Sequence, residues 1–309
     1  TARIDVPLGR VVYTCWLDER GGIVSDLTVT RLSETEFLVV TATASLTRDL
    51  AWLREQVPAD ARCAVVDVTS GLALLALRGP KSRALLKALS GEDLSNTAFP
   101  FATSRELEIG YARLRAARIT YVGELGFELW VPADQAVHVL ERTLEVGPRF
   151  GLAPAGRFAQ ESCRIEKAYR SYGHDIGIED DPFSAGLGFT VALDKPGGFI
   201  GREALLARRA APDFGRRRLV SIRLADPAVF LHREEPILED GRIVGAVSSG
   251  AFGHRLGASL GLGWIGLDGP VTPERLARGR FAVEVAGEPV PAELSLRPVY
   301  DPAGSRPRG

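Results

Sequence analysis

Asp26 is a carboxylate at a position where acidic side chains are unusual. It lies inside GGIVSDLTVTRL, residues 21–32, where β-branched residues follow two turn-forming glycines. Because β-strands disfavour aspartate, such a carboxylate is either exposed on its face of the sheet or used for chemistry. A regularly alternating strand would place Asp26 on the same face as Thr28 and on the opposite face from Ile23.

A second carboxylate, Glu128, lies in the strand series RITYVGELGFELWVP. It stands between the apolar residues Phe127 and Leu129, and a glycine-containing turn separates it from Tyr121. Taken singly, each acid could be an ordinary solvent-facing strand residue. Two such acids beside tight glycine turns weigh against that interpretation without excluding it.

The composition is that of a globular protein. The 309 residues are 45% hydrophobic and 25% charged, with a formal net charge of −1. This length allows two or three packed units, and near-neutrality creates no field that would attract nucleic acid or an anionic membrane. No apolar run is long enough for a membrane span, and no signal peptide is visible. We therefore expect a cytoplasmic protein with neither nucleic-acid nor membrane partners.

Other motifs carry less chemistry. The three scattered cysteines exclude a disulfide framework or zinc cluster, and the four histidines show no metal-ligand spacing, so we expect no metal site. GLGWIG, residues 261–266, satisfies G-x-G-x-x-G, but a turn-rich segment follows it where a dinucleotide site needs a helix. Glycines that bend barrel strands are the better interpretation.

The pattern of elements predicts an α+β protein whose last third is all-β. Residues 1–210 show a hairpin turning at residues 18–22, further strands, and helical spacing at residues 133–146, 157–173 and 201–210. From Leu219 onward, short strands alternate with turns, including Asp240-Gly241, a dipeptide that suits a type I′ turn. We predict one region at 1–210, made of two intertwined α+β subdomains, and a small antiparallel β-barrel at 216–302.

Several stretches together carry a resemblance to a known family. They include VVYTCWLDERGGIVSDLTVTRL, LALRGPKSRALL, ESCRIEKAYRSYGHDIGIEDDPFSAGLGF and PILEDGRIVGAVSSGAFG. These segments resemble the T-protein (aminomethyltransferase) of the glycine cleavage system, and more closely the folate-binding half of dimethylglycine and sarcosine dehydrogenases. The similarity runs from about residue 5 to 306. It implies a cloverleaf of three small domains that binds tetrahydrofolate.

The resemblance implies roles for individual residues. Asp26 matches the family's catalytic aspartate, and Glu128 matches the glutamate that accepts hydrogen bonds from the paired N–H donors of the pterin. Tyr121 matches a tyrosine that lines the folate site, and Thr28 lies two residues from Asp26 along the strand. The expected cofactor-binding residues are Glu128, Tyr121, Thr28, Tyr13, Gln160 and Tyr300.

One departure from the family is Gln160. Glycine-cleavage enzymes carry an arginine at this place in the helix, near the folate, and a neutral side chain cannot supply that charge. The chain therefore leans toward the dehydrogenase branch. We expect a one-carbon transferase that forms methylenetetrahydrofolate from an iminium derived from an N-methyl amine, or from formaldehyde.

Two alternatives stay open at this point. One is a folate-dependent O- or S-demethylase on the same scaffold. The other is a non-enzymatic folate-binding accessory protein of iron–sulfur assembly, although the cysteine-containing signature of those proteins is absent from EKAYRSYGHDI.

The start of the chain bears on the expected partners. The chain has no methionine, even at position 1, and the resemblance begins partway into the first domain. We therefore expect a truncated N-terminus, with FAD only in a missing N-terminal domain or a partner chain. The expected partners are a folate, an amine-derived one-carbon donor, and a flavoprotein domain or subunit.

Overall fold

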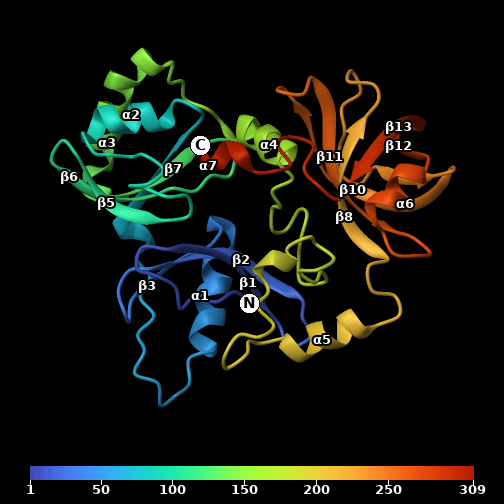
Figure 1. Ribbon diagram of the computed structural model, residues 1–309, viewed down its shortest axis with the longest axis horizontal. Helices are drawn as coiled ribbons and strands as arrows, with labels where there is room; N and C mark the ends of the chain where they lie inside the picture. The colour runs from blue at the N-terminus through green and yellow to red at the C-terminus, as the bar shows by residue number, and fades with distance from the viewer.

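The computed structural model describes all 309 residues as three lobes joined by a central helix (Figure 1). Each lobe is built on an antiparallel sheet with its own buried apolar cluster. The predicted α+β cloverleaf with a C-terminal antiparallel barrel is confirmed. None of the helices combines the length and apolar character needed to cross a membrane.

The first lobe carries the Asp26 hairpin. Its sheet has the order β1-β2-β3, formed by β1 (Val11–Leu17), β2 (Ile23–Arg31) and β3 (Phe37–Val40), and is followed by α1 (Leu46–Glu55). The predicted turn at residues 18–22 is present, and the Asp18 carboxylate accepts from the Gly22 N–H at 2.8 Å. On β2, the Ser25 hydroxyl donates to buried Asp49 of α1 at 2.8 Å. Since successive strand residues face opposite ways, Asp26 faces away from α1.

The predicted alternation of β2 is wrong at its start. The register of β1 and β2 shifts between Trp16 and Leu17, so that Cys15 pairs with Asp26 while Leu17 pairs with Ile23. This irregularity brings Ile23 onto the same face as Asp26, in one buried cluster with Cys15 and Leu17. A single extra residue in the ladder reverses the side to which a strand residue points.

The second lobe carries Glu128. Its sheet has the order β4-β7-β6-β5, formed by β4 (Leu72–Arg78), β5 (Ser104–Ile109), β6 (Ala112–Ala117) and β7 (Gly126–Pro132). The helices α2 (Ser82–Ser90) and α3 (Ala136–Val146) belong to the same lobe, and their apolar residues share one core with Phe127 and Leu129. Glu128, between those two residues, therefore points to the face away from this core.

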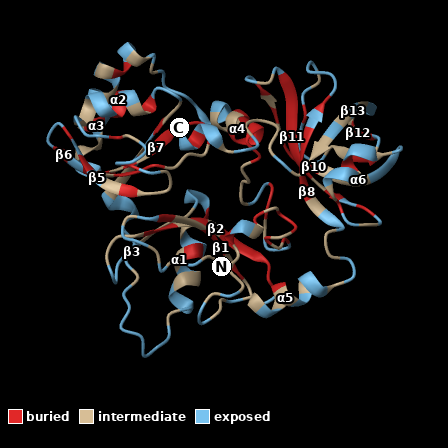
Figure 2. Cartoon of the chain, in the orientation of Figure 1, coloured by how far each residue is buried: buried red, intermediate tan, exposed pale blue.

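The third lobe is a closed barrel of order β10-β11-β8-β13-β12-β9. Its elements are β8 (Arg217–Leu224), β9 (Pro236–Glu239), β10 (Arg242–Gly253), β11 (Ala258–Gly266), β12 (Phe281–Val285), β13 (Glu288–Ser295) and α6 (Pro273–Arg278). Asp240 and Gly241 both have positive φ, as a type I′ turn requires. Among the strands, β11 has the longest continuous run of buried residues (Figure 2).

The glycine motif of residues 261–266 lies on β11, where close packing explains it. A Cβ on Gly263 would lie 2.7 Å from Ile237 Cδ1 and 2.8 Å from the Ala246 carbonyl oxygen. No helix follows within a βαβ unit, because β11 pairs antiparallel with β8 and β10. The glycines let neighbouring barrel strands approach, as the sequence predicted.

Helix α4 (Arg157–Glu166) lies between the second lobe and the barrel (Figure 1). The helical spacing extended to residue 173, but the helix ends at Glu166 because Ala168 takes a left-handed conformation with φ of 53°. The chain then turns back so that Asp175 meets Arg164. Two further helices complete the chain: α5 (Arg202–Ala210) and α7 (Ser305–Arg308).

A buried ion pair joins α4 to the returning chain and to the barrel. Arg164 and Asp175 are 2% and 1% exposed, and their side chains form a direct ion pair. Arg164 also donates to Ser249 Oγ at 2.8 Å, and Ser248 Oγ donates to Asp175 at 2.6 Å. Both charges are therefore compensated inside the protein.

We predict that Asp175→Ala destabilises the protein by about 3 kcal/mol, the low end for a broken buried pair, because Arg164 loses its buried partner and keeps only the Glu161 carboxylate at 2.7 Å. Asp194→Ala is the matched control, since it breaks an exposed pair with Arg3 worth about 0–1 kcal/mol. Thermal unfolding of both variants measures the effect. Equal melting temperatures for the two variants would show that the buried pair does not hold the fold.

Candidate functional site

Asp26 is held by a tyrosine from the neighbouring strand. The Tyr13 hydroxyl donates to Asp26 Oδ2 at 2.8 Å. Thr28 lies directly opposite Tyr13 in the β1–β2 ladder, so these three residues share one face of the sheet. The Tyr13 ring also stacks on Phe189, with centroids 6.2 Å apart, and Phe189 is 77% exposed. Three of the predicted site residues therefore come together.

The surroundings of Asp26 favour its neutral form. Burial raises the pKa of Asp26, the hydrogen bond from Tyr13 partly offsets this, and the nearby Asp49 carboxylate raises it further. Burial and the Asp26 charge also raise the pKa of Tyr13 well above its usual range, so Tyr13 stays a hydrogen-bond donor. A carboxylate with a raised pKa accepts a proton more readily than one in water.

Glu128 lies beside an arginine that sequence reasoning missed. Glu128 Oε1 is 3.6 Å from an Arg78 terminal nitrogen, and the other terminal nitrogen of Arg78 donates to Gln160 Oε1 at 2.6 Å. Arg78 ends β4, Glu128 is on β7 and Gln160 is on α4. Burial raises the pKa of Glu128, while the Arg78 charge lowers it in part. Gln160 itself carries no charge, as expected, but Arg78 brings a guanidinium to it.

Tyr121 packs against the segment that follows α4. Its hydroxyl donates to the Arg170 carbonyl oxygen at 2.6 Å, and its ring stacks on Tyr169 with centroids 5.9 Å apart. Burial raises the pKa of Tyr121, and the Asp26 charge adds to the increase. Burial lowers the pKa of Arg78, and Tyr121 is among the groups that partly offset this effect. Tyr121 is thus within electrostatic reach of both Asp26 and Arg78.

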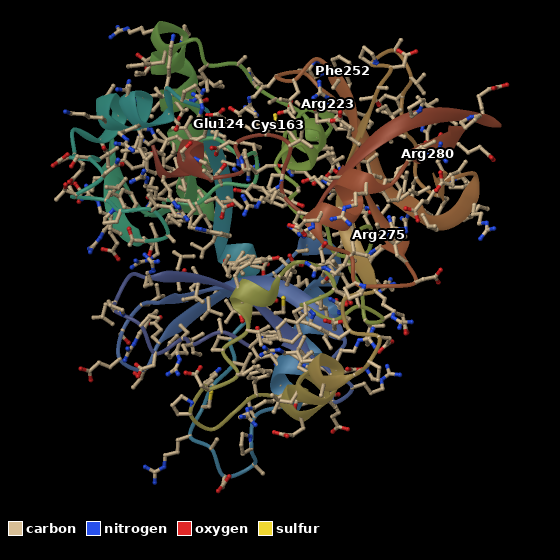
Figure 3. All side chains as sticks on the ribbon, turned by 45° about the vertical axis from the view of Figure 1, so that its right-hand side comes forward. Glu124, Cys163, Arg223, Phe252, Arg275 and Arg280 are labelled. Atoms are coloured by element: carbon tan, nitrogen blue, oxygen red, sulfur yellow. The ribbon has the colours of Figure 1, made fainter.

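Tyr300 belongs to a different cluster, at the junction of the second lobe, α4 and the barrel. Its hydroxyl donates to Glu124, and Arg255 lies over its ring at 4.9 Å. Arg255 also pairs with Glu166 at 3.0 Å. Figure 3 shows Glu124 near Cys163 of α4, in the same cluster. The structure gives Tyr300 no direct contact with Asp26 or Glu128, and its role in folate binding stays a prediction.

Arg78 could have been noticed in the sequence only as a lone charge at the end of the apolar run LALLALR. A strand-end arginine before Gly79-Pro80 usually reaches solvent, so this signal is weak. Its functional surroundings depend on Gln160, which is 82 positions away in the chain. Local sequence could not supply this pairing.

Family comparison agrees with the fold. The GCVT N-terminal domain family matches residues 1–195, and the glycine cleavage T-protein C-terminal barrel domain matches residues 217–301. The chain belongs to the glycine cleavage T-protein (aminomethyltransferase) family. The resemblance inferred from its motifs is therefore confirmed.

Individual relatives refine this likeness. The chain is 43% identical over its whole length to "4-methylaminobutanoate oxidase (formaldehyde-forming)" of Paenarthrobacter nicotinovorans, covering 36% of that protein. It is 35% identical over its whole length to human mitochondrial sarcosine dehydrogenase, covering 35% of it. The chain thus spans about a third of the length of these relatives.

A solved structure shares the fold. The aminomethyltransferase T of the Bartonella henselae glycine cleavage system superimposes with a TM-score of 0.80 at 24% identity, over 94% of this chain and 76% of that one. This likeness supports the three-lobed architecture.

We predict that Asp26→Asn melts at a temperature no lower than that of the wild type at pH 7.5. The folded-state pKa of Asp26 is raised above its unfolded-state value. As pH rises from the unfolded-state pKa to the folded-state pKa, the contribution of Asp26 to stability falls, and it stays unfavourable at higher pH. Asparagine removes the charge and still accepts from Tyr13. Any advantage of the variant should disappear at pH values below the unfolded pKa. Thermal unfolding at several pH values tests this, and a marked loss of stability at pH 7.5 would contradict it.

Proposed function

We propose that this chain is a tetrahydrofolate-binding one-carbon transferase domain that forms methylenetetrahydrofolate. The observation that carries the proposal is the presence of two desolvated carboxylates in different settings. Asp26 is bonded to a tyrosine, whereas Glu128 is bound loosely by an arginine. One is suited to handle a proton and the other to bind paired donors.

The surroundings of Glu128 fit a pterin. Its one close protein partner is Arg78, at the long distance of 3.6 Å, so most of the acceptor capacity of the carboxylate is unused by the protein. A partly buried carboxylate with free acceptor positions requires hydrogen-bond donors. The adjacent N–H groups of a pterin supply two of them side by side. Glu128 would hold the pterin, with Tyr121 nearby.

Asp26 is assigned the proton-handling role. When bound, a reduced folate supplies a nucleophilic nitrogen that accepts the one-carbon unit. The Asp26 carboxylate would stabilise positive charge near that nitrogen and take up the proton that is released. Tyr13 fixes the orientation of the carboxylate through its hydrogen bond, while Thr28 lies on the same face.

The donor is assigned by analogy with the relatives. Those named above are an oxidase of a methylamino acid that forms formaldehyde and a dehydrogenase of an N-methyl amino acid. We infer that the donor is an N-methyl-amine-derived iminium or formaldehyde. A flavoprotein domain or subunit would deliver it, and FAD would belong to that partner.

We predict that Glu128→Gln weakens binding of 5-formyltetrahydrofolate at least tenfold. Glutamine replaces one acceptor oxygen with a donor, and a lost charge-assisted hydrogen bond costs about 1.5–3 kcal/mol. Isothermal calorimetry measures the affinity, with Glu106→Gln, an exposed strand acid of the same lobe, as control. Equal affinity in the variant and the wild type would remove Glu128 from the site.

We predict that Asp26→Asn binds the same ligand with only a modest loss but transfers the one-carbon unit about 100- to 10,000-fold more slowly, the usual contribution of a positioned proton acceptor. The measurement is methylenetetrahydrofolate formation from formaldehyde, after subtraction of the uncatalysed rate. Wild-type turnover by the variant would show that Asp26 is an ordinary strand acid.

A further inference from the structure

Arg78 occupies a special place on the second-lobe sheet. On the antiparallel strands β4 and β7, Ala76 pairs with Glu128, so Arg78 is the diagonal neighbour of Glu128 on the same face. This face points away from the core that contains α2 and α3. Both side chains are largely buried, with exposed fractions of 16% for Arg78 and 14% for Glu128.

The guanidinium is fixed from the other side by α4. Gln160 Oε1 accepts from Arg78 at 2.6 Å, a short contact, while the Arg78 Nε–H is buried without a partner. Arg78 thus forms its short hydrogen bond with the neutral amide of Gln160, and it lies 3.6 Å from the carboxylate of Glu128. Glu128 is close enough to feel the positive charge, yet its oxygens are not fully occupied by it.

We propose that Arg78 is a positioning residue that keeps Glu128 ionised and oriented for ligand binding, and that Gln160 acts by holding Arg78. The inference rests on the proposed function, in which Glu128 accepts from the paired donors of a pterin. It changes the expected role of Gln160, because the carbonyl oxygen of Gln160 is engaged by Arg78.

The physical reason lies in the cost of a buried carboxylate. Burial alone favours the protonated acid, and an opposite charge nearby restores the ionised form. The only charged group that bears on the pKa of Glu128 is Arg78, which lowers it against the effect of burial. Tyr121 and Cys163 of α4 lie around Arg78, and neither of them is a cation. Without Arg78, burial alone would act, and the pKa of Glu128 would rise further, which favours a protonated oxygen facing the donors of the ligand.

The test compares Arg78→Met, which removes the charge, with Arg78→Lys, which keeps it. Arg113→Met, at an exposed position of the same sheet, is the control. Two quantities are measured between pH 6 and 8.5: the affinity for 5-formyltetrahydrofolate by calorimetry, and the titration of Glu128 in the free protein by carbon NMR. Glu128→Gln identifies the Glu128 resonance.

We expect Arg78→Met to raise the pKa of Glu128, so that affinity falls about tenfold for each pH unit below that pKa. Affinity falls with falling pH because the protonated fraction of Glu128 grows. Arg78→Lys and Arg113→Met should keep the flat wild-type profile. In the Glu128→Gln background, Arg78→Met should add less than about twofold, because the two residues act through one carboxylate.

Two results would overturn the proposal. An unchanged Glu128 titration in Arg78→Met would show that Arg78 does not control the ionisation of Glu128. An equal loss of affinity at every pH, also present in the Glu128→Gln background, would show that Arg78 contacts the ligand directly. If the wild type bound no reduced folate while the Glu128 titration still shifted, the folate assignment would fail and the link between Arg78 and Glu128 would stand.

Discussion

The buried ion pair between Arg164 and Asp175 is the interaction on which the arrangement of the lobes depends. Its two members are on α4 and on the chain that returns against the first lobe, and serines of the barrel complete their hydrogen bonds. A buried pair is stable only when its geometry and its remaining hydrogen bonds are satisfied together. The pair therefore forms only when all these segments are in place, which ties the barrel to the rest of the chain.

Helix α4 makes further contacts with other parts of the chain along its length. Gln160, near its start, reaches Arg78 of the second lobe, and Ser162 donates to the Phe252 carbonyl of the barrel at 2.6 Å. At its end, Glu166 pairs with Arg255 of the barrel, and Lys167 pairs with Asp301 of the C-terminal segment at 2.9 Å. The helix that carries Gln160 therefore contacts the second lobe, the barrel and the C-terminal segment.

The two carboxylates show how one residue type can serve two purposes. Burial raises the pKa of both Asp26 and Glu128, but their partners differ. A neutral tyrosine donates to Asp26, and the Arg48 charge offsets the effect of burial only in small part, as the proposed proton uptake would need. A guanidinium beside Glu128 favours the ionised form, which suits the binding of paired donors. In each case the neighbouring side chain decides how far the effect of burial on the pKa is offset.

Much of this could be read from the sequence. Local patterns determined the hairpin at residues 18–22, the barrel turn at Asp240-Gly241 and the strand around Glu128, because turn residues and apolar alternation act over a few positions. The motifs also identified the family and singled out Asp26 and Glu128. The tertiary structure decided the rest: the register shift that moves Ile23, the end of α4 at Glu166, and the meeting of Arg78 with Gln160. The first two are settled by backbone geometry that residue types alone do not reveal, and the third by a contact between positions 82 apart in the chain, which no local pattern contains.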